Sequence, residues 1–305
     1  PLLNEAESLQ QLYSEIVEYS PKDYEIIFIN DGSDDNSEQV LEEIAFKDSS
    51  VKVVHFRKNF GKAAALNKGF GLAKGEIVFT LDADLQDNPV EIPKFINKIE
   101  EGYDLVSGWK ENRKDPLTKR LPSKFFNWVT TSTFKLKLHD YNCGFKAYRK
   151  EVIKEISLYG ELHRYIPVLA KAKGFRISEI PVLHRARQFG NSKYGVERYL
   201  RGFFDLLTVK LITQYNRSPL YLFGGVGSIM TSLGILINLY LSVLKFGYGY
   251  SLTNRPLLLF GTLLIIAGVQ FFSIGLLGEL MINQTKKHSS NDSISIKKIT
   301  NLNES

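Results

Sequence analysis

Hydrophobic residues follow two alternating spacings between residues 5 and 109. Short runs rich in β-branched or aromatic residues predict strands, and they lie at 25–30, 51–56, 76–81 and 104–109. Apolar residues at helical spacing predict helices at 5–19, 37–47, 62–74 and 89–101. This alternation favours an α/β fold with a mostly parallel sheet that is covered by helices on both faces. Ligands of such folds bind at the carboxyl ends of the strands.

The start of the chain predicts one further strand. The first predicted helix begins at residue 5, although a helix in this alternation normally follows a strand. The printed sequence begins with Pro1 rather than Met. We therefore expect most of a first strand to precede the printed residues.

Two long segments near the C-terminus contain no charged side chain, at 220–244 and 257–278. As helices they would each reach at least roughly 33 Å, which exceeds a hydrocarbon core of about 30 Å. Buried core helices are the alternative interpretation. Lys and Arg are concentrated outside this pair, at 198–217 and 286–287, which predicts cytoplasmic outer ends. We expect a multi-pass protein of the cell inner membrane with its catalytic domain in the cytoplasm.

The composition excludes several classes of protein. The chain has 305 residues, of which 44% are hydrophobic and 24% are charged, so it can bury a core and is not disordered. A single cysteine, Cys143, excludes an intramolecular disulfide framework, a Cys-based zinc finger and a CxxC redox pair. We expect Cys143 to be a packed small residue. We also expect the histidines to pack rather than bind a metal, since the spacing of His139, His163 and His184 fits no ligand pattern.

Acidic residues follow two of the predicted strands. Asp31 follows the strand at 25–30, and Asp82 and Asp84 follow the strand at 76–81. The neighbouring Asp34 and Asp35 can act simply as loop and helix-cap residues. Two carboxylates two positions apart at the end of a buried strand repel each other unless a cation or a donor lies between them. Mg²⁺ or Mn²⁺ would fit, and either ion would keep coordination positions for phosphate oxygens.

Several motifs together resemble a known family. NEAESL, NDGSDDNS, NFGKAAALNKGF and DADLQD occur in this order and resemble glycosyltransferase family 2 with a GT-A fold. NCGFKAYRKEV, HRY and RQFGNSKYG, followed by the two apolar segments, are similar to polyisoprenyl-phosphate glycosyltransferases. These are relatives of dolichyl-phosphate mannose synthase, here of the bacterial type with two transmembrane helices. The resemblance covers about residues 1–280.

The resemblance implies roles for individual residues. The nucleotide pocket would be lined by Pro1, Asn4, Glu5, Asp31 and Asp82. The metal ligands would be Asp82, Asp84 and Gln86. Positions near the sugar and the acceptor would be Asp140, His163 and Arg164, which makes Asp82, Asp84, Asp140 and Arg164 the catalytic candidates.

A lipid phosphate acceptor would explain the distribution of basic residues. A phosphate monoester is largely dianionic at neutral pH, so it needs cations to hold it beside an anionic donor more than it needs a base. Forked guanidinium donors and hydroxyls suit its oxygens. The candidates are Arg113, Arg120, Ser123, Arg187, Ser192 and Lys193. Contact with anionic lipid headgroups is the alternative for Lys119, Lys124, Lys135 and Lys137.

These observations predict four regions. A GT-A catalytic domain at 1–194 precedes a juxtamembrane amphipathic helix at 195–217, a transmembrane hairpin at 218–280 and a polar cytoplasmic tail at 281–305. A second interfacial helix is expected at 121–134, within the catalytic domain. Gly224 and Ser228 allow close helix packing, either within the hairpin or between copies of the chain.

The predicted activity is inverting transfer of one hexose from a nucleotide sugar, with UDP-glucose favoured, to a polyprenyl phosphate at the cytoplasmic membrane face. Mg²⁺ or Mn²⁺ would be the cofactor, and nucleic acid is not an expected partner. A processive polysaccharide synthase is disfavoured because its QxxRW motif is absent around Trp109 and Trp128. A transferase to a hydroxyl acceptor and an inactive nucleotide-sugar-binding membrane scaffold remain as alternatives.

Overall fold

The computed structural model describes residues 1–110, 127, 129–183, 185, 197–215, 218–251 and 256–288. The chain divides into two compact units. Among the described residues, the first unit ends at Val209 and the second begins at Lys210. The division falls inside helix α8 (Glu197–Gln214), which coincides with the amphipathic helix expected from the sequence. The predicted boundaries at 194, 217 and 280 stay predictions.

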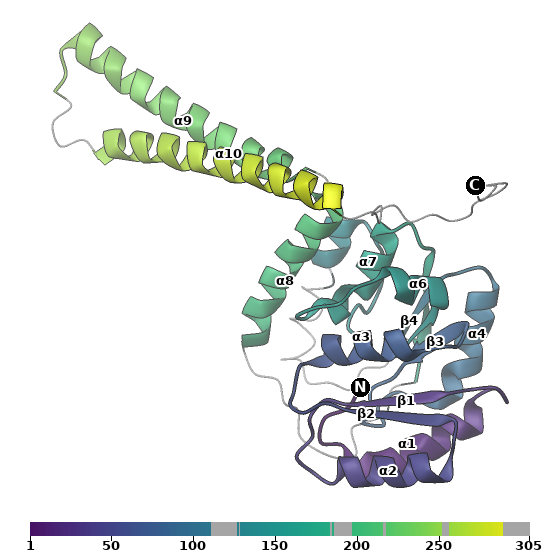
Figure 1. Cartoon of the computed structure of the whole chain (residues 1–305). Coiled ribbons are helices and arrows are strands. Elements are labelled where there is room, and N and C mark those ends of the chain that lie inside the picture. Colours follow the sequence, from purple (N-terminus) through teal and green to yellow (C-terminus); the bar gives the residue numbers. More distant parts are fainter. Residues whose placement is uncertain are drawn as a thin grey trace. The chain divides into compact units, whose positions relative to one another are not determined.

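The N-terminal part of the first unit is a two-stranded parallel layer with helices on both faces (Figure 1). Its strands are β1 (Ile26–Asn30) and β2 (Val51–His55), and its helices are α1 (Ala6–Tyr19), α2 (Ser37–Lys47) and α3 (Lys62–Leu72). Leu9 of α1, Phe28 of β1 and Leu41 of α2 belong to one buried cluster. The apolar spacing in the sequence therefore predicted these three helices.

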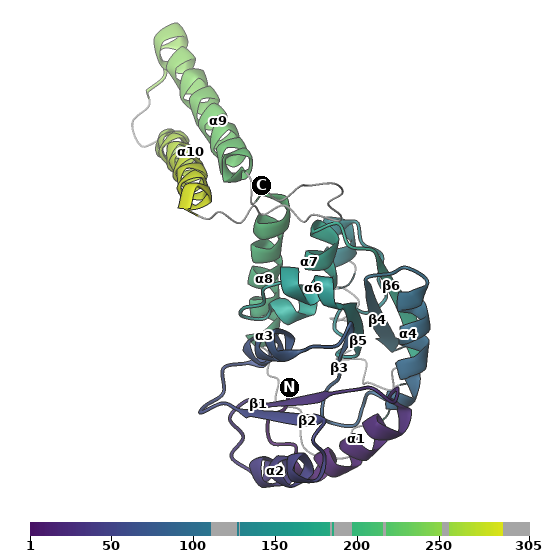
Figure 2. The same cartoon turned by 45° about the vertical axis from the view of Figure 1, so that its right-hand side comes forward.

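A four-stranded sheet follows, in the order β3-β5-β4-β6 (Figure 2). Its strands are β3 (Ile77–Thr80), β4 (Leu105–Lys110), β5 (Lys146–Arg149) and β6 (Ile177–Val182). Its helical segments are η1 (Pro89–Glu91), α4 (Ile92–Glu100), α6 (Lys150–Glu155), η2 (Leu162–Tyr165) and α7 (Ile166–Ala172). β4 and β6 are parallel, whereas β5 runs antiparallel to both of its neighbours. The mixed α/β fold with parallel strand pairs is as predicted, but β5 and β6 were not predicted.

An apolar cavity separates β1 from β3. The cavity holds about 2030 Å³ of space that protein atoms do not fill, part of it open to solvent, and side chains of both strands line it. Leu2 forms one parallel bridge with Asn30 on this edge of β1. The additional strand expected from the sequence stays a prediction.

The second unit contains two long apolar helices, α9 (Pro219–Tyr248) and α10 (Pro256–His288). Each is long and apolar enough to cross a membrane, and only 17% and 11% of their most apolar windows are buried. The low burial argues against buried core helices, because the outward surface of both helices is almost entirely hydrophobic. The two predicted spans are confirmed as helices of suitable length and composition.

Glycines bring α9 and α10 together along one face. A Cβ atom on Gly227 would lie 2.5 Å from the carbonyl oxygen of Gly268, and one on Gly234 would lie 2.6 Å from that of Gly261. Such small residues let helix backbones approach closely where lipid offers no hydrophobic driving force. Close packing therefore occurs within the hairpin, and homo-oligomerisation stays a prediction.

Gly268→Leu is expected to disrupt the hairpin, because its side chain would collide with Thr231 and with the carbonyl oxygen of Gly227. The purified protein should lose its sharp melting transition in detergent and elute as a broad, aggregated species. Gly225→Leu is the matched control, since a Cβ atom there meets nothing within 4 Å. Equal thermal stability of the two variants in detergent would contradict the observed packing.

Candidate active site

The acidic residues predicted at the strand ends have different contacts in the structure. Asp31, directly after β1, is 5% exposed and accepts backbone hydrogen bonds from Phe60 (2.7 Å) and Gly61 (2.9 Å). Its carboxylate therefore fixes the loop that leads into α3. A contact between Asp31 and the nucleotide base or ribose stays a prediction.

The residues predicted to line the nucleotide pocket are organised by the loop after β1. The backbone N–H of Asn4 donates to Ser33 Oγ at 2.9 Å, and Asn4 Oδ1 accepts from the backbone N–H of Asp34 at 2.9 Å. The carboxylate of Asp35 accepts from the backbone N–H groups of Ala6 (3.1 Å) and Ser37 (2.9 Å). The prediction of Asp34 and Asp35 as loop and cap residues agrees with these contacts. The backbone N–H of Glu5 donates to Ser37 Oγ at 3.2 Å.

Asp82 is the charged centre of the site. Its Oδ1 forms an ion pair with Lys62 Nζ, which reaches it from the first turn of α3. Burial alone would raise the pKa of Asp82, but Lys62 and then Lys110 outweigh this effect and hold the pKa well below its usual range. The carboxylate is therefore ionised at every physiological pH. The other predicted metal ligands follow it on a tight turn.

That turn brings Asp84 and Gln86 together. Leu85 is fully buried and has a φ of 59°, a conformation that L-residues rarely adopt. The turn lets the backbone N–H of Gln86 donate to Asp84 Oδ1 at 3.2 Å. The carbonyl oxygen of Gln86 in turn accepts from the backbone N–H of Arg185 at 3.0 Å, and the Arg185 guanidinium is paired with Glu15 at 2.7 Å. The sequence analysis did not identify Arg185, which links the segment after β6 to this turn.

Asp87 and Lys110 form a buried ion pair behind Asp82. Lys110 Nζ lies 3.6 Å from Asp87 Oδ1, and Asp87 is 1% exposed. Burial raises the pKa of Asp87, whereas the nearby carboxylates raise that of Lys110 against the effect of its own burial. The backbone N–H of Asp82 lies 3.5 Å from Asp87 Oδ2. The pair therefore places the Lys110 ammonium group, balanced by Asp87, close enough to Asp82 to lower the pKa of that carboxyl.

The residues at the end of β3 fit a hard divalent cation. Asp82 and Asp84 offer carboxylates and Gln86 offers an amide oxygen, which are ligands that such ions prefer. The described part of the chain holds no group of three or more His, Cys, Asp or Glu side chains placed for a metal. A site with two carboxylates instead suits an ion that also takes phosphate oxygens from its substrate. Lys62 and such an ion would compete for Asp82 Oδ1.

Gly144 is packed directly against the Asp82 carboxylate. A Cβ atom at this position would lie 2.5 Å from Asp82 Oδ2 and 2.7 Å from Asp82 Cγ. The carbonyl oxygen of Gly144 accepts from Thr80 Oγ1 at 2.8 Å, which fixes the backbone. Glycine is therefore required here for steric reasons, because the carboxylate occupies the space of a side chain.

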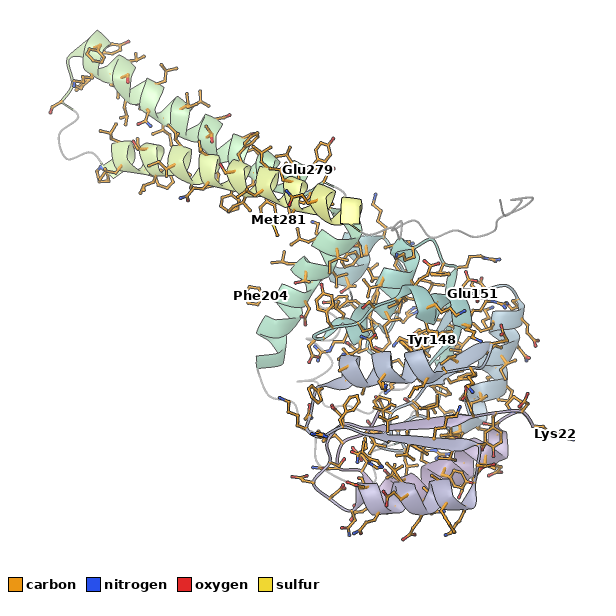
Figure 3. The ribbon with its side chains drawn as sticks, in the orientation of Figure 1. Lys22, Tyr148, Glu151, Phe204, Glu279 and Met281 are labelled. Carbon is orange, nitrogen blue, oxygen red and sulfur yellow. The ribbon has the colours of Figure 1, made fainter. Side chains whose placement is uncertain are left out.

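A small polar cavity of about 20 Å³, room for a group the size of one water molecule or one phosphate oxygen, lies beside Asp82 and is partly open to solvent. Its polar or charged side chains are Lys62, Thr80, Asp82, Asn142, Lys146, Tyr148, His163 and Arg164. Figure 3 shows Tyr148 inside the first unit. The structure thus brings Pro1, Asp82, His163 and Arg164 to one cavity. Asn4, Glu5, Asp31, Asp84, Gln86 and Asp140 do not line this cavity.

His163 and Arg164 differ in charge at this cavity. Burial lowers the pKa of His163 to about 2, so its imidazole is neutral. Arg164 is paired with Glu161 at 2.7 Å. Asp140 is 3% exposed, and its Oδ1 accepts from the backbone N–H of Asn142 at 3.0 Å. Asp140 therefore shapes the segment before β5, and its role in catalysis stays a prediction.

Two predictions of ordinary packing agree with the structure. Cys143 is fully buried, and burial raises the pKa of its thiol to about 12, so it is a packed residue rather than a nucleophile. His139 stacks on Trp109 with the ring centroids 4.1 Å apart and pairs with Glu179 at 2.5 Å.

The predicted acceptor-phosphate residues lie outside the part of the chain that the structure describes. They are Arg113, Arg120, Ser123, Arg187, Ser192 and Lys193, and they stay predictions. Most of the interfacial helix expected at 121–134 also lies outside the described residues, although 129–134 are helical. Helix α8 carries exposed apolar residues, Phe204 (63%, labelled in Figure 3) and Leu207 (42%), as the predicted interfacial role requires.

Lys146 was missed by the sequence analysis. In a parallel sheet the site residues are expected to follow the strands, whereas Lys146 begins one. β5 is antiparallel, so its first residue lies opposite Thr80, the last residue of β3, at the same edge of the sheet. The signal in the sequence was a lysine within the otherwise apolar stretch GFKAY.

Comparison with known proteins assigns this fold and site to a family. The family model for glycosyl transferase family 2 matches residues 1–157. This chain belongs to glycosyl transferase family 2. It is therefore a glycosyltransferase, as the motifs in the sequence indicated.

Two relatives of known activity match most of the chain. A dodecaprenyl-phosphate galacturonate synthase of Rhizobium johnstonii is 36% identical over 290 residues, which cover 92% of this chain and 86% of the relative. An undecaprenyl-phosphate 4-deoxy-4-formamido-L-arabinose transferase of Proteus mirabilis is 37% identical over 284 residues, with the same two coverages. The similarity to both relatives extends beyond the part of the chain that the family model matches.

The GT-A fold class is confirmed by solved structures. Glucosyl-3-phosphoglycerate synthase from Mycobacterium tuberculosis, crystallised with Mn²⁺, UDP and glucosyl-3-phosphoglycerate, superposes with a TM-score of 0.53. The match covers 70% of this chain and 77% of that one at 16% sequence identity. At this identity the likeness establishes the fold alone.

Proposed function

We propose that this family 2 glycosyltransferase moves one sugar from a nucleotide-sugar donor to a polyprenyl phosphate, with inversion at the anomeric carbon, at the cytoplasmic face of the inner membrane. The observation that carries the proposal is the presence in one chain of an ionised carboxylate, Asp82, beside a cavity lined by basic side chains, and of two helices long enough to span a membrane. The two relatives support it, because the name of each combines a polyprenyl phosphate with a sugar.

Each residue of the site would have its own role in the reaction. Asp82, Asp84 and Gln86 would hold Mg²⁺ or Mn²⁺, which would stabilise the negative charge of the departing diphosphate as a Lewis acid. The ammonium groups of Lys62 and Lys110 lie near Asp82 and keep its carboxylate ionised by lowering its pKa. The neutral His163 imidazole can exchange hydrogen bonds without adding charge to the cavity.

No strong general base is needed for this acceptor. The phosphate monoester is already a nucleophile near neutral pH, because its second pKa is about 6. One of its oxygens forms the bond to the anomeric carbon, and the bond between that carbon and the diphosphate oxygen breaks with its electron pair leaving on the diphosphate. The protein must therefore bind and align two anions, which is the task that a cation-rich site performs.

UDP-glucose stays a prediction from the sequence. The two relatives are named for galacturonate and formamido-arabinose, so neither supports glucose as the transferred sugar. A panel of nucleotide sugars is required to identify the donor.

The test is transfer of label into the organic phase. Membranes that contain the protein are incubated with each radiolabelled nucleotide sugar and with polyprenyl phosphate, and the matched control contains the corresponding unphosphorylated polyprenol. We expect label in the lipid fraction with polyprenyl phosphate only, and a mild-acid-labile β- or α-phosphodiester of inverted anomeric configuration. Label that depends on the free hydroxyl of polyprenol, or its absence with every donor, would overturn the proposal.

A further inference from the structure

Lys146 is a buried lysine whose surroundings differ from those of the other basic residues in the site. The residue is 3% exposed, and its ammonium group donates to the carbonyl oxygen of Cys143. Within the described residues no carboxylate lies at ion-pair distance from it, whereas Lys62 is paired with Asp82, and Arg164 with Glu161. A buried charge without a counter-ion is costly, so an anion is the partner that this position lacks.

The position of Lys146 points it at the reaction site. It lies opposite Thr80 in the antiparallel ladder, and paired residues of a ladder point to the same face of the sheet. Asp82 follows Thr80 by two positions, and both Lys146 and Asp82 line the same cavity. Burial lowers the pKa of Lys146, while Asp140 and Asp82 oppose this effect and Lys62 adds to it. The ammonium group therefore belongs to the same electrostatic cluster as the predicted metal ligands.

We propose that Lys146 binds a phosphate oxygen of the reacting substrates inside this cavity and stabilises its negative charge during sugar transfer. This inference rests on the proposed function and names a further catalytic residue for it. Both substrates carry phosphate oxygens: the donor has a diphosphate, and the lipid acceptor has a phosphate monoester. A lysine ammonium is a compact charge that suits either of them. It transfers no proton to either substrate, so the bond changes are those given above.

The variants separate the charge of Lys146 from its volume. Lys146→Met keeps an unbranched side chain, shorter by the ammonium group alone, and removes the charge, and Lys146→Arg restores a charge. Lys150→Met is the matched control, because Lys150 lies four residues further along the chain, bonds to the carbonyl oxygen of Lys74 at 2.8 Å and does not line the cavity. Removal of an uncompensated buried charge should leave the melting temperature of Lys146→Met unchanged or raised. A folding defect would therefore not explain a loss of activity.

We expect Lys146→Met to lower kcat/KM for sugar transfer by about 100-fold or more, the loss typical of a group that stabilises developing charge. Lys150→Met should remain within about twofold of wild type, and Lys146→Arg should regain part of the lost activity. The source of the phosphate follows from binding measurements that need no turnover. Titration with UDP and Mn²⁺ reports the donor diphosphate, and titration with a short-chain prenyl phosphate reports the acceptor.

Weaker UDP binding by Lys146→Met would identify the donor diphosphate as the partner, and weaker prenyl phosphate binding would identify the acceptor. Unchanged affinity for both, together with unchanged turnover, would overturn the inference. A loss confined to donors whose sugar carries a carboxylate would also overturn it, since Lys146 would then bind the sugar. Failure of the wild type to label any lipid would refute the proposed function, whereas the two titrations would still decide the role of Lys146.

Discussion

Asp82→Asn is expected to reduce kcat/KM for sugar transfer by about 1000-fold, the largest single effect in this chain. The substitution keeps the shape of the side chain and removes the negative charge that Lys62 and Lys110 hold in place. Asparagine offers one neutral oxygen, which binds a divalent cation far more weakly than a carboxylate does. The ion pair with Lys62 is lost as well, so both this pair and the binding of the cation depend on the charge of Asp82.

The measurement is steady-state transfer at several Mn²⁺ concentrations, with far-UV circular dichroism and melting temperature as checks on the fold. Asp34→Asn is the matched control, because it makes the same chemical change at an exposed loop position of the same unit. It should remain within about twofold of wild type. Near-normal turnover of Asp82→Asn, or transfer that persists after complete chelation, would show that the metal site is assigned to the wrong residues.

Gly144→Ala should lower kcat/KM by about 100-fold, although it adds a single methyl group at a position far from Asp82 in sequence. The added Cβ atom would lie 2.5 Å from Asp82 Oδ2, well inside contact distance. The backbone of Gly144 is held by Thr80 at 2.8 Å, so the Asp82 carboxylate must move instead. Its displacement would misplace the ligands at the end of β3.

Gly71→Ala provides the control for this prediction. Gly71 lies in α3, and a Cβ atom there meets nothing within 4 Å. Alanine at an open helical position is expected to raise stability by up to about 1 kcal/mol and to leave turnover unchanged. The two variants are compared by melting temperature, by kcat/KM and by the Mn²⁺ concentration that gives half-maximal rate. A normal Mn²⁺ requirement in Gly144→Ala would contradict the steric argument.

The N-terminal elements and the two apolar helices were predictable because their signals are local. The helix predicted at 37–47 is α2 with the same bounds, and the segment at 220–244 lies within α9. Helical periodicity indicates which face of a helix is buried, and a long charge-free run indicates a segment that can face lipid. The acids at the ends of β1 and β3 were found for a related reason, since strand ends are where a parallel sheet places its polar groups.

β5 could not be predicted in the same way. Its sequence KAYR begins with a charged residue and is only four residues long, so neither composition nor length identifies a strand. Its place between β3 and β4 depends on pairing with strands that are distant in sequence. The role of Gly144 could not be predicted for the same reason. It depends on contact with Asp82, which is distant in sequence and follows β3.

The direction of β5 also has a consequence for how this enzyme can change its acceptor. The chain leaves the sheet at Lys110, the last residue of β4, and re-enters it at Lys146, the first residue of β5. Because the two strands are antiparallel neighbours, exit and return lie at one rim of the sheet. The segment between the two strands could therefore differ in length and sequence while the strand register is kept, provided that Gly144 stays packed against the Asp82 carboxylate. Under the proposed function, a new acceptor would then require a change in this segment rather than a new fold.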